Sequence, residues 1–383
     1  MFANQSVNSS AIHFEEPRAL RIFRLIIFSL VIVASLLGNA VVLKAVFELT
    51  RKSVTHYLVA NLAAAEIIVS ILNPFIVAYS EFMYWPFGSF LCRLISPMQT
   101  FSIVVITNTL AAIALHRYRV FSTHHTRRKL SSKEIGLVLL MIWVIALAIV
   151  FPSFLFQRLT PANPKRFPGK FWCIEIFPDG PEFPSPMMRR FYMARFLLNY
   201  VIPVIIMSAS YGFVSVKLRH HRNRSIRDNE ITRNTSEQEN DPTTQQPNVS
   251  SQQPQQQNGA GESIEMATKA AENKNSSRSR PAYGVRDRMT RRKDFVRLER
   301  DLLKMFYIII LVFLVCYFPY QVFFLLEYFG VIHWETWKYF TVIRNYAFLI
   351  PCFSSALHPL CYGTMSKFFA RALSRLVLCK NRD

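Results

Sequence analysis

The sequence alternates between seven long apolar stretches and shorter polar connections. Each stretch is long enough for a helix to cross the hydrocarbon layer of a bilayer, which is about 30 Å thick and takes about 20 residues. Apolar stretches of this length predict membrane helices. We expect these helices at residues 24–47, 57–79, 91–121, 135–156, 191–216, 298–328 and 338–362.

The third stretch is the element around which we expect the others to pack. Cys92 stands near its start and Arg117 near its end. At about 1.5 Å per residue, one helix separates them by roughly 37 Å, so the thiol and the guanidinium lie at opposite faces of the bilayer. Any membrane helix can carry such ends, but this one has six other apolar stretches around it.

Composition and charge fit a membrane protein better than a nucleic-acid-binding protein. The 383 residues are 51% hydrophobic and 14% aromatic, and the mean hydropathy is +0.19. The net charge of +21 lies mostly in the connections, where the positive-inside rule and attraction to anionic lipid explain it. Nucleic acid is therefore not expected as a partner.

The distribution of Lys and Arg predicts the orientation of the chain. The first, third and fifth connections and the C-terminal tail hold most of these residues, which favours an outside N-terminus and an inside C-terminus. The fourth connection weakens the contrast, because it is also basic. Its cations are Arg158, Lys165, Arg166, Lys170, Arg189 and Arg190.

Glycosylation and one disulfide are expected on the outer side. The N-terminal tail, residues 1–23, carries glycosylation acceptors at Asn4 and Asn8. No cleavable signal peptide is visible, so the first helix is expected to act as a signal anchor. Of six cysteines, only Cys92 and Cys173 lie in or beside connections on one side, so we expect one disulfide and otherwise free thiols.

The inner side is expected to hold a long polar segment and a surface helix. Residues 219–297 connect the fifth and sixth helices, and residues 228–280 are so rich in Gln, Asn, Ser and Pro that we expect disorder. Residues 364–383 should include a basic amphipathic helix lying on the membrane, with Cys379 a candidate for palmitoylation. The expected fold is an all-α membrane protein, a seven-transmembrane helix bundle with a C-terminal amphipathic helix.

One marker in each helix, in order, gives the chain a resemblance to the rhodopsin-like (class A) G-protein-coupled receptors. The markers are Asn39, residues 61–66, Arg117 within His-Arg-Tyr, Trp143, Pro203 with Tyr211, Pro319, and Pro359 with Tyr362. Cys92 and Cys173 match the family's extracellular disulfide.

Within this family the chain is most similar to the peptide receptors. Gln99 stands where amine receptors carry the Asp that pairs with the ligand's ammonium. The resemblance implies a plasma-membrane receptor that transmits the binding of a neuropeptide-like ligand to a heterotrimeric G protein. It also implies arrestin, receptor kinases and membrane lipid as partners.

The resemblance assigns the signalling step to Arg117. In the family, an acidic neighbour and a glutamate at the foot of the sixth helix hold this arginine in the inactive state. Glu299 fits the second partner, but His116 replaces the acidic neighbour and cannot act as a counter-ion. We hypothesise a looser inactive state with raised basal signalling; the alternative is that His116 only forms a hydrogen bond.

Glu66 and His358 form a second departure from the family pattern. Relatives usually carry Asp and Asn at these places, where they line a sodium pocket. Opposite charges within about 4–6 Å favour each other's ionised form. We hypothesise that an internal Glu66–His358 pair replaces bound sodium, so no metal is expected. A neutral hydrogen bond between the two is the alternative.

The ligand pocket is expected at the outer ends of the helices. Its candidate residues are Gln99, Arg195, Tyr320, Gln321, Phe324, Glu327, Arg344 and Glu81. The carboxylates suit a basic peptide residue and the arginines an acid or terminal carboxylate, unless these groups pair with one another. The other expected switch residues are Tyr118, Tyr211, Phe313, Tyr317, Pro319, Pro359 and Tyr362.

Other functions fit the sequence less well. No catalytic constellation stands out, so neither an enzyme nor a cofactor is expected; a membrane hydrolase would need ligands converging on a metal. A transporter would show internal repeats, and an opsin needs a Lys in the seventh helix, where residues 341–362 have none. The alternative that stays open is a receptor-like peptide scaffold or scavenger with weak or no G-protein coupling.

Overall fold

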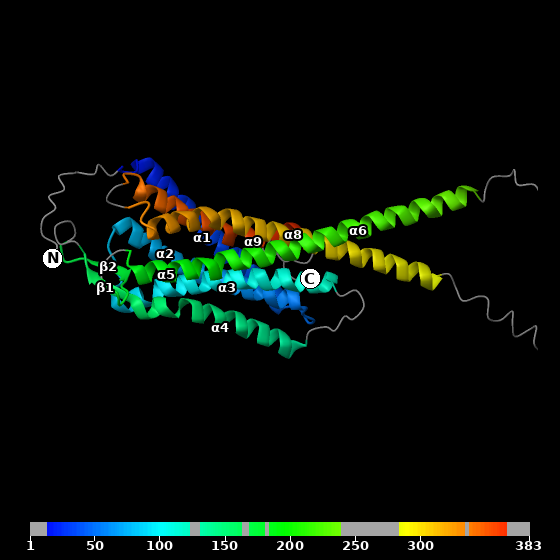
Figure 1. Ribbon diagram of the computed structural model, residues 1–383, viewed down its shortest axis with the longest axis horizontal. Helices are drawn as coiled ribbons and strands as arrows, with labels where there is room; N and C mark the ends of the chain where they lie inside the picture. The colour runs from blue at the N-terminus through cyan, green and yellow to red at the C-terminus, as the bar shows by residue number, and fades with distance from the viewer. Residues whose placement is uncertain are drawn as a thin grey trace, which may run out of the picture. The chain divides into compact units, whose positions relative to one another are not determined.

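The computed structural model describes residues 14–122, 131–162, 168–180, 184–238, 283–333 and 337–365. The helices are α1 (Arg18–Phe47), α2 (Val54–Phe82), α3 (Gly88–Ser122), α4 (Ser132–Phe156), α5 (Pro186–Phe196), α6 (Ile202–Gln238), α8 (Tyr283–Tyr328) and α9 (Phe340–Met365) (Figure 1). A π-helical turn, η1 (Leu197–Val201), joins α5 to α6, so these three form one continuous helical element.

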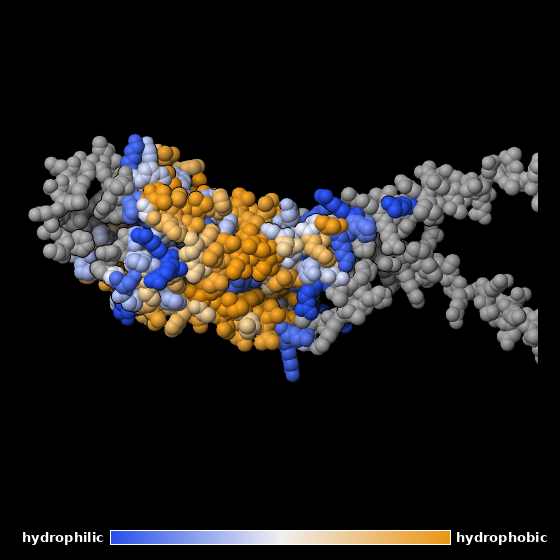
Figure 2. Space-filling model, in the orientation of Figure 1, coloured by the Kyte–Doolittle hydropathy of each residue, from blue (hydrophilic) through white to orange (hydrophobic). Residues whose placement is uncertain are grey.

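In the part of the chain that the structure describes, seven helical elements are long and apolar enough to cross a membrane, as the sequence predicts. They are contributed by α1, α2, α3, α4, the combined α5–η1–α6 element, α8 and α9. Large apolar side chains are exposed on their outer faces, for example Leu37 on α1 and Leu140 on α4. Figure 2 shows an apolar band across the middle of the visible face of the bundle, between more hydrophilic ends. The chain is therefore a multi-pass membrane protein.

The chain divides into two compact units, residues 1–216 with 301–383 and residues 217–300. The first holds the helix bundle; the second includes the end of α6 and the start of α8. The prediction of disorder from residue 228 is wrong for residues 228–238, which are helical. This stretch has neither Pro nor Gly, and extending an existing helix needs no new nucleation. Residues 239–280 of the polar segment lie outside the described residues.

The third helix is the most deeply buried of the seven. In α3, 67% of the most apolar 18-residue segment is buried, against 22–44% in the other six spans. A polar side chain joins it to α2, since Nδ2 of Asn61 donates to Thr109 Oγ1 on α3 at 2.8 Å. The Trp143 indole on α4 donates to Oδ1 of the same Asn61 at 2.8 Å, so this amide joins three helices. α3 is thus the central element, as expected.

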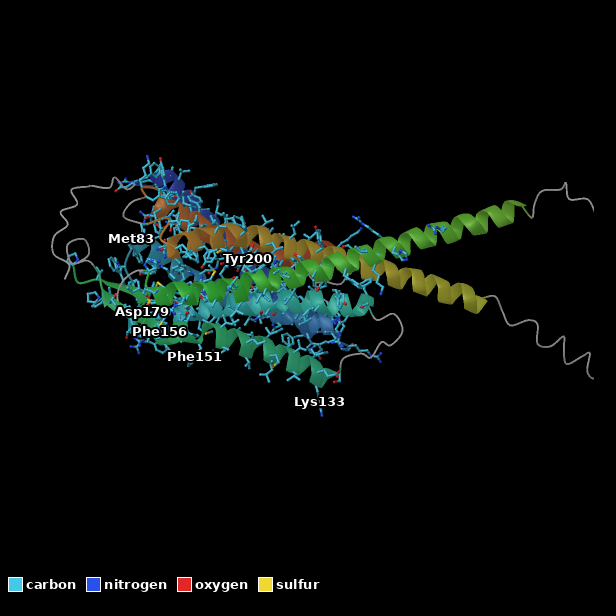
Figure 3. All side chains as sticks on the ribbon, in the orientation of Figure 1. Met83, Lys133, Phe151, Phe156, Asp179 and Tyr200 are labelled. Atoms are coloured by element: carbon cyan, nitrogen blue, oxygen red, sulfur yellow. A yellow bond between two sulfur atoms is a disulfide. The ribbon has the colours of Figure 1, made fainter. Side chains whose placement is uncertain are left out.

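A disulfide-linked hairpin covers one end of the bundle. β1 (Gln157–Pro161) pairs antiparallel with β2 (Phe171–Glu175), an element that the sequence analysis did not predict. Cys173 on β2 forms a disulfide with Cys92 at the start of α3, with 5.6 Å between the Cα atoms, which confirms the predicted pairing. We call this the disulfide end and the opposite end of α3 the Arg117 end. Figure 3 labels Asp179 near the disulfide end and Lys133 at the other end of α4.

The loop after β2 fixes the start of α5. The Asp179 carboxylate accepts hydrogen bonds from the Met187 backbone N–H at 2.6 Å and the Ser185 hydroxyl at 2.7 Å, and Ser185 Oγ caps the helix by accepting from the Met188 N–H. Desolvation raises the pKa of Asp179, but these hydrogen bonds outweigh it and hold the pKa below its ordinary value. The cap fixes where α5 begins and hence which side chains face the bundle.

α1 and α9 touch with almost no space between them. A Cβ atom on Gly38 would lie 2.8 Å from Cβ and 2.9 Å from Cγ of Pro359. Beside this contact, Nδ2 of Asn39 donates to the backbone oxygen of Ser355 at 3.0 Å. The small residue of the Gly38–Asn39 pair allows the close approach, and the amide bridges the two helices.

Candidate functional site

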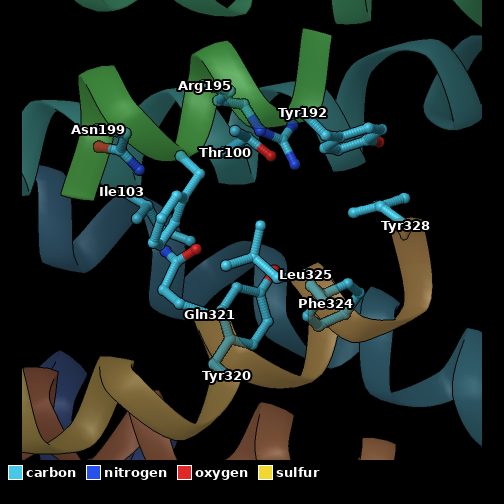
Figure 4. Close-up of a pocket in the computed structure, with 11 residues that line it drawn as sticks. Thr100, Ile103, Tyr192, Arg195, Asn199, Tyr320, Gln321, Phe324, Leu325 and Tyr328 are labelled. Carbon is cyan, nitrogen blue, oxygen red and sulfur yellow. The ribbon is translucent and has the colours of Figure 1, made fainter. Parts of the chain in front are cut away.

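The bundle is hollowed between α3, α5, η1 and α8. The cavity has about 500 Å³ of space not filled by atoms, part of it open to solvent. Four predicted ligand-binding residues line it: Arg195, Tyr320, Gln321 and Phe324 (Figure 4). The other lining residues are Thr100, Ile103, Tyr192, Phe196, Asn199, Leu325 and Tyr328.

Arg195 supplies the cation of this cavity. Its guanidinium carbon lies 4.1 Å from the centre of the Tyr192 ring and 5.7 Å from that of Phe191. Among the described residues, no carboxylate lies within ion-pair distance of Arg195. Stacking on aromatic rings stabilises a guanidinium. Its N–H donors lie in the guanidinium's own plane, so they stay available for a ligand.

Aromatic rings form the wall beside Arg195. Tyr192 and Tyr328 stack with ring centres 3.6 Å apart, and Tyr320 and Phe324 lie 4.4 Å apart. The Tyr192 hydroxyl donates to the Glu175 carboxylate on β2 at 2.7 Å, which ties the wall to the hairpin. The hairpin therefore helps to fix the ring that supports the cation.

Gln99 faces a second, neighbouring hollow. Its amide donates to Asn73 Oδ1 at 2.9 Å, and Nδ2 of Asn73 donates to Cys352 Sγ at 3.4 Å. Tyr317 and Tyr320 also line this hollow, so Tyr320 borders both. Gln99 is 9% exposed and is held by bonds within the bundle.

Glu81 belongs to an ion-pair cluster at the disulfide end of α1 and α2. Its carboxylate lies 2.7 Å from Arg24 Nη1 and 2.5 Å from Arg21 Nε, and Arg24 Nη2 lies 2.6 Å from Glu16. Arg24 is only 2% exposed. Glu81 therefore pairs with two arginines of α1, and not with Arg195 or Arg344 as the alternative supposed.

Glu16 gains stabilisation from this cluster. Burial raises the pKa of its carboxyl group, but hydrogen bonds from Arg24 and Tyr346 and the charges of Arg24 and Arg21 outweigh the burial, so the pKa lies below its ordinary value. Next to Glu16, the Phe14 N–H donates to the Lys338 carbonyl at 3.0 Å, and the Phe14 ring lies 5.2 Å from that of Tyr339. The segment before α1 is thus bound to the start of α9.

Glu327 and Arg344 do not pair in the described part of the chain, and neither lines the two hollows. Glu327 is 7% exposed, and its Oε2 has no hydrogen-bond partner among the described residues. The guanidinium of Arg344 lies 5.8 Å from the Phe324 ring centre and is exposed. A role for either residue in ligand binding stays a prediction.

The predicted Glu66–His358 contact is present in the middle of the bundle. Oε1 of Glu66 contacts Nδ1 of His358, and both side chains are 0% exposed. Nε2 of His358 lies 3.2 Å from Ser354 Oγ, so both ring nitrogens have partners. Whether the pair replaces sodium stays a prediction.

Arg117 is buried where α3 meets α2 and α8. It is 3% exposed, its Nη2 donates to Thr55 Oγ1 at 3.0 Å, and its guanidinium carbon lies 4.9 Å from the centre of the Phe306 ring. His116 beside it is half-buried. Glu299 lies on α8, but its side chain is outside the described part, so its pairing with Arg117 stays a prediction.

Most of the other expected switch residues are buried in the bundle. The Tyr317 and Phe313 ring centres lie 4.5 Å apart, and those of Tyr118 and Phe213 lie 4.8 Å apart. Pro319 stands inside α8 and Pro359 inside α9. Tyr211 and Tyr362 are 7% and 0% exposed.

Comparison with known proteins identifies the family. Residues 38–362 match the family described as "7 transmembrane receptor (rhodopsin family)". The chain belongs to the rhodopsin family of seven-transmembrane receptors. This is a family of receptors and not a class of enzymes.

Rhodopsin-family relatives with similar sequences include receptors named for peptides. The chain is 22% identical over 369 residues to the Tachykinin-like peptides receptor 86C of Drosophila melanogaster, which covers 96% of this chain and 60% of that receptor. It is 28% identical over 231 residues to the Neuropeptide Y receptor type 6 of Mus musculus (57% of the chain, 60% of the receptor) and 30% identical over 193 residues to the mouse Neuropeptide Y receptor type 2 (50% of each). The chain thus spans 60% or less of the length of these relatives.

Within this rhodopsin-family bundle, sequence reasoning missed Asn199. This side chain is 7% exposed, lines the cavity from η1, and has an Oδ1 without a hydrogen-bond partner among the described residues. A signal was present, because an amide within an apolar membrane stretch is expensive unless it is functional or paired. Nothing in the sequence indicated that the rings of Tyr192 and Tyr328 would stack on each other.

Three predicted sites lie outside the described residues. They are the glycosylation acceptors Asn4 and Asn8 and the palmitoylation candidate Cys379, together with the amphipathic helix at residues 366–379.

Proposed function

We propose that the chain is a plasma-membrane receptor that binds a peptide in the cavity beside Arg195 and activates a heterotrimeric G protein at the Arg117 end. The observation that carries this proposal is the placement of both sites on α3. Thr100 and Ile103 of α3 line the cavity, and Arg117 follows on the same helix after roughly 25 Å. One buried helix can therefore couple occupancy at one end to a change at the other.

A peptide ligand is supported by the chemistry of the cavity and by the relatives. The described cavity lining includes an arginine, two amides and several aromatic rings but no carboxylate, which does not suit a small amine. The relatives named above are receptors for tachykinin-like peptides and neuropeptide Y. A neuropeptide-like ligand is the simplest explanation of both the cavity lining and the similarity to these relatives.

The proposed orientation has the disulfide end outside the cell, with the N-terminus. Disulfides persist in oxidising compartments, and basic residues gather in the connections at the opposite end. In this orientation the Arg117 end faces the cytosol. Arrestin, receptor kinases and the surrounding lipid would be further partners.

Reconstituted receptor gives a direct test. The full chain in lipid nanodiscs would be mixed with purified G proteins of each class and with pools of synthetic peptides, and nucleotide exchange would be measured. We expect at least one pool to accelerate exchange in the wild type and not in Arg117→Ala, which should still bind the peptide. If peptides bind but no G protein responds, the chain is a peptide-binding scaffold or scavenger and the coupling proposal is wrong.

A further inference from the structure

Among the described residues, the lining of the cavity has one cation, Arg195, and no carboxylate. Arg195 and its neighbour Tyr192 both point into the cavity, and Figure 4 shows the guanidinium on the cavity side of α5. Glu175 accepts a hydrogen bond from the Tyr192 hydroxyl. Its charge acts on Arg195 from a distance, but the two form no ion pair in the described part of the chain. A guanidinium partly removed from water has five donors to satisfy, and a carboxylate or phosphate matches two of them at once.

Asn199 supplies a second polar group on the cavity wall. Its side chain is more than nine-tenths buried and lines the same cavity. Figure 4 shows its amide nitrogen on the cavity side and its oxygen turned away. An amide N–H donates, so a backbone carbonyl of a ligand can accept from it.

Both groups lie on one helical element. Asn199 follows Arg195 by four residues, about one helical turn, across the start of η1. The Arg195 guanidinium stacks on Tyr192, three residues earlier in the chain, so it extends away from Asn199. A ligand that reaches both groups must therefore be longer than a single peptide unit, as a peptide of several residues is.

The aromatic wall suits an apolar neighbour of that carboxylate. Tyr320, Phe324 and Tyr328 lie side by side, with ring centres 4.4 Å and 6.1 Å apart. Aromatic rings stabilise apolar or aromatic side chains by burial and by edge-to-face contacts.

We propose that the ligand presents a carboxylate to Arg195, a backbone carbonyl to the Asn199 amide N–H and an apolar or aromatic side chain to the Tyr320–Phe324–Tyr328 wall. This rests on the proposed function and narrows it to peptides that carry a carboxylate deep in the cavity. The carboxylate has two sources, a free C-terminus or an acidic side chain.

Synthetic tetrapeptide pools separate the two sources. All pools share the same mixture of uncharged and apolar residues. The first pool has an amidated C-terminus, the second a free C-terminal carboxylate, the third an amidated C-terminus with one glutamate, and the fourth the same with glutamine in place of glutamate. Binding is read from thermal stabilisation of the purified full chain in nanodiscs and, separately, from nucleotide exchange.

We expect the second or the third pool to bind the wild type at least about 30-fold more tightly than the first and fourth, because losing one partner of a desolvated charge pair costs about 2 kcal/mol or more. Preference for the second pool identifies the C-terminus, and preference for the third identifies an acidic side chain. This comparison uses only the wild type and does not depend on the folding of a variant.

Variants then test whether Arg195 is the residue that binds the carboxylate. Arg195→Gln should reduce the ratio of the affinities for the carboxylate and amide pools to nearly one. Arg195→Lys should leave a ratio above one but below that of the wild type, because lysine keeps the charge but lacks the two parallel N–H donors of a guanidinium. Arg189→Gln, on the exposed face of the same helix, is the matched control and should bind as the wild type does.

Equal binding of carboxylate and amide pools by the wild type would overturn the inference, as would an unchanged preference in Arg195→Gln. Either result, with exchange still accelerated by peptide, leaves the receptor proposal standing. If no pool of any form binds, the peptide proposal fails and this inference fails with it.

Discussion

The carboxylate of Glu66 contacts Nδ1 of His358 across α2 and α9, and neither side chain has any exposed surface. A polar contact so deep in a membrane bundle is expensive unless both partners are satisfied. The ring's other nitrogen faces Ser354, so the imidazole joins two helices and positions Pro359 beside it. The family pattern leads us to expect Asp and Asn at these two positions, and this chain has Glu66 and His358 instead.

We predict that Glu66 and His358 are energetically coupled. Glu66→Asp or His358→Asn alone should lower the free energy of unfolding by about 1–3 kcal/mol, because each leaves a buried polar group without its partner. The double variant should recover at least about 1 kcal/mol of the summed loss. Thermal unfolding of the purified receptor in a double-mutant cycle measures this; simple additivity would contradict it.

The same variants test whether the pair replaces sodium. We expect the unfolding temperature of the wild type to be the same in sodium chloride and in choline chloride at equal ionic strength. The double variant, with Asp and Asn, should be stabilised by sodium alone. A wild type that sodium stabilises as strongly as the double variant would rule out the replacement.

We predict that Gly38→Ala destabilises the bundle by about 1–3 kcal/mol. The added Cβ would meet the Pro359 ring at 2.8 Å, and neither the ring nor the two helix backbones can move aside cheaply. Gly136→Ala on α4 is the matched control, since its Cβ would meet nothing within 4 Å. That control should be neutral or stabilising by up to about 1 kcal/mol. Equal unfolding temperatures for the two variants would mean that the α1–α9 contact is not tight.

We predict that basal signalling depends on the surroundings of Arg117. His116→Asp adds a carboxylate next to the guanidinium and should lower ligand-free nucleotide exchange by about fivefold, which corresponds to about 1 kcal/mol. Thr55→Val removes a hydrogen bond to Arg117 and should raise it, whereas Thr55→Ser keeps the hydroxyl and serves as control. Identical basal exchange in the wild type and His116→Asp would reject the hypothesis of a loosened inactive state.

We predict that the segment before α1 detaches in acid. Because the pKa of Glu16 is lowered in the folded state, its pairing with Arg24 contributes fully above the ordinary value of 4.5 and is lost as the pH falls through the lowered pKa. Hydrogen exchange of the Phe14 amide, which bonds to Lys338, should therefore quicken below about pH 4.5 relative to α3 amides. Glu16→Gln should show the fast exchange already at neutral pH, and the exposed Glu15→Gln should not. Exchange independent of pH in the wild type would contradict this.

Much of the bundle could be predicted, because the length and hydropathy of an apolar stretch are enough to predict a membrane helix. The seven spans follow from hydropathy, and the Cys92–Cys173 disulfide follows from the positions of the cysteines. The Glu66–His358 contact was expected only from the resemblance to the family, whose members line a pocket with the residues at these two places. α1 begins at Arg18, six residues before the expected membrane span, and this start carries three arginines. Two of these arginines, Arg21 and Arg24, pair with Glu81 on α2.

The details of the cavity could not be predicted in the same way. Which arginine pairs with which carboxylate depends on side-chain geometry between helices, so Glu81 was expected in the pocket but lies in an ion-pair cluster. Likewise, the hairpin between α4 and α5 forms from a loop whose composition, rich in Pro and charge, did not indicate strands.

The π-helical turn from Leu197 to Val201 has a bearing on how this receptor is aligned with others. A wider turn holds more residues than an α-helical one, and each residue is worth about 100° of rotation in a regular helix. Counting back from Pro203 on an ideal helix would therefore aim Arg195 in a different direction from the one it takes. Relatives that lack such a turn should present a different side chain to the corresponding cavity. Residues that align in sequence along this helix therefore need not contact the ligand in the same way.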